Sequence, residues 1–124
     1  MRLKDKVAII TGGGRGIGRA IAIGFAHQGA HIVVAARTES EIIEVADKVK
    51  ALGRESLGIV CDISNEDQVK NLVDLTMRKF NQIDVLINNA GIGSMRPVYD
   101  TQLESFEKVL KVNLTGTFLC TKHV

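Results

Sequence analysis

Short apolar runs alternate with helical segments along almost the whole chain, and this alternation restricts the possible folds more than any other feature. Four runs are rich in β-branched residues and are separated by segments whose apolar residues recur about every 3.6 positions. The runs are continuous, which is typical of parallel strands buried on both faces. The pattern predicts strands at residues 6–11, 31–36, 56–61 and 83–88, helices at 17–27, 39–52 and 66–80, and a fourth helix, capped by Asp100 or Thr101, that continues to Leu110.

This order of elements implies right-handed βαβ crossovers and a parallel sheet with helices on both faces. The fold class expected is α/β, a Rossmann-type doubly wound parallel sheet with about four strands present of a larger sheet. No internal repeat or linker interrupts residues 1–124, so we expect one domain. Residues 113–124 read as helical and end without Gly or Pro. We therefore expect a half-domain truncated within a helix; a naturally short module is the alternative.

Composition and charge indicate which general class of protein this chain belongs to. The 124 residues are 45% hydrophobic and 24% charged, with a net charge of +2 and no basic block, which is typical of a soluble globular domain. No apolar run approaches the ~20 residues of a membrane span. We therefore expect a cytoplasmic protein with no nucleic-acid or membrane partner. Cys61 and Cys120 have no metal-type spacing, so we expect reduced core thiols and no metal site.

A glycine-rich loop, Thr-Gly-Gly-Gly-Arg-Gly-Ile-Gly at residues 11–18, lies between the first predicted strand and the first helix. Backbone N–H groups and the positive helix end can hold a diphosphate at such a junction. Gly12 would permit the tight turn, and Gly16 would let phosphate oxygens approach the backbone. Gly18 would let the helix pack closely against the strand. A purely structural turn is the alternative. A nucleotide hydrolase is disfavoured, because Arg19-Ala20 stand where its phosphate loop has Lys and then Ser or Thr.

The spacing Thr-Gly-x-x-x-Gly-x-Gly resembles the short-chain dehydrogenase/reductase family, and four further matches make the resemblance specific. They are Cys61-Asp62-Ile63 after the third strand, Asp84 entering the fourth, Asn88-Asn89-Ala90-Gly91 after it, and Val112-Asn113. The resemblance runs in register from Lys6 to Lys122. Within the family, the sequence is similar to 3-oxoacyl reductase-like members. It implies reversible hydride transfer between a nicotinamide cofactor and a carbonyl or secondary alcohol.

The resemblance also implies roles for single residues. Asp62 and the Ile63 backbone would recognise adenine, and Asn113 would be catalytic by supporting a water relay. The alternatives are a turn carboxylate for Asp62 and an ordinary strand-ending turn for residues 88–91. The cofactor-binding residues expected are Gly12, Gly14, Arg15, Gly16, Ile17, Gly18, Ala36, Arg37, Thr38, Asp62, Ile63, Asn89, Ala90 and Gly91.

The end of the second strand predicts the cofactor. A carboxylate there binds the ribose hydroxyls of NAD and repels the extra phosphate of NADP, whereas an arginine pairs with that phosphate. This chain has Ala36-Arg37-Thr38 at that position, with Arg15 as a second cation and no acid between Val33 and Thr38. NADP(H) is therefore favoured over NAD(H), with Thr38 a further donor. The alternative is that Arg37 is a solvated strand-end charge.

In the family, a Tyr is the acid/base, assisted by a Lys four residues later, and a Ser orients the substrate. The single Tyr here is Tyr99, and Leu103 lies four residues on, so Tyr99 is expected to pack near the loop at 93–97 instead. We expect the chain to be the cofactor-binding half of a homo-oligomeric oxidoreductase acting on a small carbonyl or alcohol substrate, inactive by itself. A non-catalytic dinucleotide-binding or sensor module is the alternative.

Overall fold

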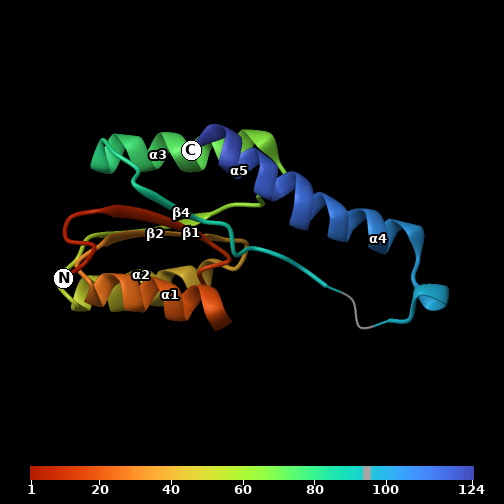
Figure 1. Ribbon diagram of the computed structural model, residues 1–124, viewed down its shortest axis with the longest axis horizontal. Helices are drawn as coiled ribbons and strands as arrows, with labels where there is room; N and C mark the ends of the chain where they lie inside the picture. The colour runs from red at the N-terminus through yellow and green to blue at the C-terminus, as the bar shows by residue number, and fades with distance from the viewer. Residues whose placement is uncertain (94–95) are drawn as a thin grey trace.

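A four-stranded parallel sheet lies between two layers of helices (Figure 1). The computed structural model describes residues 1–93 and 96–124. The strands β1 (Val7–Thr11), β2 (His31–Ala36), β3 (Ser56–Val60) and β4 (Val85–Ile87) are arranged in the order β3-β2-β1-β4. This arrangement confirms the predicted fold class.

Helices α1 (Gly16–His27) and α2 (Glu39–Ala51) cover one face of the sheet, and α3 (Glu66–Phe80) and α5 (Thr117–His123) cover the other (Figure 1). A 3₁₀ turn, η1 (Val98–Asp100), precedes α4 (Leu103–Leu110), and the π-helix η2 (Lys111–Gly116) joins α4 to α5. Figure 1 shows α4 extending beyond the sheet.

The start of α4 differs from the prediction. Its N-cap is Gln102, and Asp100 belongs to η1 instead. The Thr101 hydroxyl donates a hydrogen bond backwards to the carbonyl of Pro97 at 2.9 Å, so it caps no helix. The expected capping by Asp100 or Thr101 is therefore wrong, because Asp100 ends the 3₁₀ turn η1 and Thr101 is the C-cap of that turn.

The two central strands are buried on both faces, which explains their continuous apolar sequence. In β1, Val7 and Ile9 join the core beneath α3 and α5, whereas Ala8 and Ile10 join the core beneath α1 and α2. Strand β3 is at one edge of the sheet, and its Val60 is 50% exposed.

Asp84 fixes the position of the edge strand β4. The Val7 N–H donates to Asp84 Oδ2 at 2.8 Å, and the Asp84 N–H donates to the Val7 carbonyl at 2.9 Å. These two bonds align the start of β4 with the start of β1. The carboxyl ends of both strands consequently reach the same edge of the sheet.

Cys61 and Cys120 are buried and free, as expected of core thiols. Burial, with the nearby Cys120 and Asp62, raises the pKa of Cys61 to about 12, so its thiol is neutral at physiological pH. Among the residues that the structure describes, no group of His, Cys, Asp and Glu is arranged to hold a metal ion. None of the described helices is long and apolar enough to cross a membrane.

Tyr99 does not pack as the sequence suggested. The residue is 92% exposed, because η1 lies far from the sheet, and α4 runs from there back towards it (Figure 1). The loop against which it was expected to pack includes residues 94 and 95, which lie outside the described residues.

Candidate functional site: a cavity at the carboxyl ends of the strands

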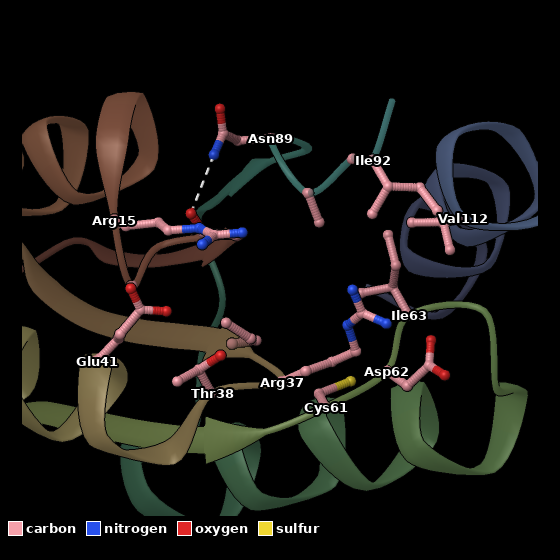
Figure 2. Close-up of a pocket in the computed structure, with 16 residues that line it drawn as sticks. Arg15, Arg37, Thr38, Glu41, Cys61, Asp62, Ile63, Asn89, Ile92 and Val112 are labelled. Atoms are coloured by element: carbon pink, nitrogen blue, oxygen red, sulfur yellow. Dashed lines mark hydrogen bonds between the residues drawn. The ribbon is translucent and has the colours of Figure 1, made fainter. Parts of the chain in front are cut away.

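A cavity of about 230 Å³ opens where the sheet strands end and the helices begin (Figure 2). In open parallel sheets this crevice is where ligands bind. The structure brings many of the predicted cofactor-binding residues together in its lining: Gly12, Gly14, Arg15, Ala36, Arg37, Thr38, Asp62, Ile63, Asn89, Ala90 and Gly91. Gly16, Ile17 and Gly18 lie in the first turn of α1, outside that lining.

The glycine loop turns sharply from β1 into α1. Gly12 has a φ of +64°, in the left-handed region that favours glycine, and its N–H donates to the Ala35 carbonyl at 2.8 Å. Arg15 is the N-cap of α1 and makes no side-chain cap hydrogen bond. The N–H groups of the first helical turn are therefore not capped by that side chain, an arrangement suited to an anion.

Gly18 lets α1 approach the strand ends closely. A Cβ at this position would contact the Gly12 carbonyl oxygen and lie 2.5 Å from Asn89 Nδ2. Asn89 Nδ2 itself donates to that same carbonyl oxygen at 3.1 Å (Figure 2). The absence of a side chain at Gly18 therefore makes room for the bond that joins two walls of the cavity.

Thr11 fastens the loop after β4 to the end of β1, a role that the sequence analysis missed. Its fully buried hydroxyl accepts hydrogen bonds from the N–H groups of Asn89 at 3.1 Å and Ala90 at 3.0 Å. The same hydroxyl donates to the Ile87 carbonyl at 3.3 Å. The sequence signal was a lone hydroxyl residue ending an apolar strand directly before the glycines.

Two arginines extend into the cavity from different walls (Figure 2). Arg15 comes from the glycine loop and Arg37 from the turn after β2, and neither forms an ion pair or hydrogen bond with any described residue. Thr38 is the N-cap of α2 and makes no side-chain cap bond, so its hydroxyl is also available. This end of the cavity can therefore bind an anionic group.

Asp62 combines a turn role with a place in the cavity wall. Its Oδ1 accepts from the Ser64 hydroxyl at 2.7 Å and from the Ser64 N–H at 3.0 Å. The hydrogen bond from the Ser64 hydroxyl is the largest influence that lowers the pKa of Asp62, and Arg37 and Lys111 add to it. The turn-carboxylate alternative therefore describes what Oδ1 does. The ionised Asp62 side chain also lines the cavity.

The sequence profile of the short chain dehydrogenases matches residues 6–124. The chain belongs to the short-chain dehydrogenase/reductase family. It is 40% identical to a 3-oxoacyl-[acyl-carrier-protein] reductase of Synechocystis, over 98% of this chain and 50% of the relative. It is 38% identical to an uncharacterized oxidoreductase of Thermotoga maritima, over 98% of this chain and 47% of the relative. The chain thus spans about half the length of the curated relatives that it matches.

Solved structures agree with this assignment. An NAD⁺-bound xylitol dehydrogenase superposes with a TM-score of 0.96 at 35% identity, over 100% of this chain and 48% of the other. A short-chain type dehydrogenase/reductase from Mycobacterium marinum superposes with a TM-score of 0.93 at 37% identity, over 98% of this chain and 49% of the other. The predicted family resemblance is confirmed.

In this chain, Asn113 lies in the π-helix η2, outside the cavity lining. Its Oδ1 accepts from the Ile92 N–H at 2.8 Å, and its Nδ2 donates to the Ile92 carbonyl at 2.7 Å. Ile92 lines the cavity, so the Asn113 side chain holds one wall in place. The sequence placed Asn113 in a helix but did not indicate that its amide is engaged with the loop after β4.

We expect Gly18→Ala to lower the free energy of unfolding by about 1–3 kcal/mol, because the added methyl group forces Gly12 and Asn89 apart. Gly24→Ala is the matched control in the same helix, where an added Cβ meets nothing within 4 Å. That control should be neutral or stabilise by about 0.5–1 kcal/mol. Urea unfolding of both variants measures the difference, and equal stabilities would contradict the packing role of Gly18.

Proposed function

We propose that this chain is the NADP(H)-binding half of an oxidoreductase that transfers a hydride between NADP(H) and a carbonyl or secondary alcohol. The observation that carries the proposal is a pair of arginines in a cavity beside a glycine loop, Arg15 and Arg37, neither of which forms an ion pair with a described residue. When bound, the nicotinamide supplies or accepts the hydride. The residues of this chain would bind and orient that cofactor.

Each wall of the cavity matches one part of the dinucleotide. Gly12, Gly14, Gly16 and Ile17, with the free N–H groups that begin α1, would bind the diphosphate, and Gly18 would let α1 approach it. The 2′-phosphate would lie among Arg15, Ala36, Arg37 and Thr38. Asp62 and the Ile63 backbone would bind the adenine, and Asn89, Ala90 and Gly91 the ribose next to the nicotinamide. Asn113 would support catalysis by holding Ile92 and its loop.

A non-catalytic dinucleotide-binding or sensor module is the second candidate. One observation favours it, namely that Tyr99, the single tyrosine, is 92% exposed and does not line the cavity. Such a module would use the same pocket without a proton donor. Turnover in the whole protein would distinguish the two candidates.

An exposed apolar stripe supports self-association. Phe106, Leu110 and Leu114 are 53%, 44% and 67% exposed and recur at helical spacing along α4 and η2, with Leu103 and Phe118 continuing the row. Large exposed apolar patches mark interaction surfaces. We propose that a second copy of the chain covers this stripe, in a cytoplasmic protein that has a small-molecule substrate and needs neither nucleic acid nor membrane.

Fluorescence titration with NADPH and NADH tests the proposal directly. We expect NADPH to bind roughly tenfold to a hundredfold more tightly, because a charged hydrogen bond contributes about 1.5–3 kcal/mol. The two cofactors differ only in the 2′-phosphate, so NADH is the matched control for the rest of the site. Equal affinities would show that Arg15 and Arg37 form no phosphate pocket.

A further inference from the structure

Glu41 is an acidic residue of the cavity that lies beside the glycine loop. It belongs to the first turn of α2 and lines the cavity together with Arg15 and Thr38. A Cβ built on Gly14 would lie 3.0 Å from the Cβ of Glu41, so the side chain begins in contact with the loop. Figure 2 shows Glu41 and Arg15 on the same side of the cavity.

No local hydrogen bond holds the Glu41 carboxylate away from the cavity. Thr38-Glu39-Ser40-Glu41 has the spacing of a capping box, in which the last residue would bond back to the backbone of the first. Here the Thr38 side chain makes no cap bond, and Glu41 forms no hydrogen bond or ion pair with any described residue. The carboxylate is therefore available to interact with whatever occupies the cavity.

The charges that line the cavity balance each other. Arg15 and Arg37 contribute two positive charges, and Glu41 and Asp62 contribute two negative charges. A phosphate monoester brings about −1.5 to −2 at neutral pH. The arginines therefore attract the 2′-phosphate while a carboxylate on the Arg15 side repels it.

We propose that Glu41 is a specificity-determining residue that limits the preference of this pocket for NADP(H) over NAD(H). The inference rests on the proposed function, since it concerns the same pocket. Glu41 would repel the diphosphate that both cofactors carry, but only NADP(H) also brings a 2′-phosphate, so the affinity for NADP(H) is reduced more than the affinity for NAD(H). The effect is electrostatic and moderate, because the site is open to solvent and salt.

The test compares Glu41→Gln with Glu39→Gln by fluorescence titration with NADPH and NADH. Glu39 is the matched control, since it lies in the same helical turn and is exposed but does not line the cavity. We expect Glu41→Gln to bind NADPH roughly fivefold more tightly, with a smaller gain for NADH, and both gains to shrink as salt is raised. Glu39→Gln should alter neither affinity.

Three results would overturn the inference. One is a Glu41→Gln protein with the wild-type ratio of NADPH to NADH affinity, and another is the same change in both variants. The third is a gain that is insensitive to salt, which would indicate a structural effect. By contrast, a wild-type protein that binds neither dinucleotide would overturn the proposed function itself, so the two failures are distinguishable.

Discussion

A protein made of these 124 residues alone should reduce no carbonyl compound at a measurable steady rate. The proposed reaction needs a proton donor at the substrate oxygen, and general acid catalysis typically contributes about 10²–10⁴-fold. The single tyrosine, Tyr99, is 92% exposed and lies outside the cavity lining. The expected result is therefore a bound cofactor without turnover.

The assay follows NADPH absorbance with a panel of ketones on protein whose mass has been verified. A titration of the same sample with NADPH serves as the control, because it shows that the dinucleotide site is occupied during the assay. Steady turnover would mean that residues described here as scaffold carry the chemistry. Asn113 and Tyr99 would then be the first positions to substitute.

Replacing Ala36 with Asp should reverse the cofactor preference. Ala36 is the last residue of β2 and lines the cavity directly before Arg37. A carboxylate there would face the 2′-phosphate of NADPH and would accept hydrogen bonds from the ribose hydroxyls of NADH. We expect NADPH binding to weaken roughly tenfold to a hundredfold and NADH binding to improve.

Fluorescence titration with both cofactors measures the change. Ala51→Asp is the matched control, because it introduces the same carboxylate at an exposed position at the other end of α2. That control should leave both affinities as they are in the wild type. An Ala36→Asp protein that retains its NADPH affinity would place the 2′-phosphate elsewhere.

The central strands could be predicted from the sequence because a strand that is buried on both faces needs a continuous run of apolar residues. β2 has the predicted bounds, and β1 begins one residue later than expected, because both lie in the centre of the sheet. The edge strand β4 is shorter than predicted and only partly buried. Only Val85, Leu86 and Ile87 pair with β1, so the flanking residues 83, 84 and 88 that the prediction included lie outside the strand.

Contacts between distant residues could not be predicted in the same way. The N–H groups of Asn89 and Ile92 donate to the side chains of Thr11 and Asn113, which lie 78 and 21 positions away in the sequence. Neither segment alone indicates which residue it will contact. The π-helix η2 also escaped prediction, because six residues between two α-helices are too few to show a period different from that of an α-helix. Glu41 was missed because its place in the cavity depends on how α2 packs against Gly14.

The central claim is that Arg15 and Arg37 form a pocket for a 2′-phosphate. Adenosine 2′,5′-bisphosphate and adenosine 5′-monophosphate test it most directly, because they differ only in that phosphate and need no nicotinamide site. Isothermal titration calorimetry should show the bisphosphate binding roughly tenfold to a hundredfold more tightly, with the difference shrinking as salt is raised. Equal affinities for the two nucleotides, or no binding of either, would contradict the account.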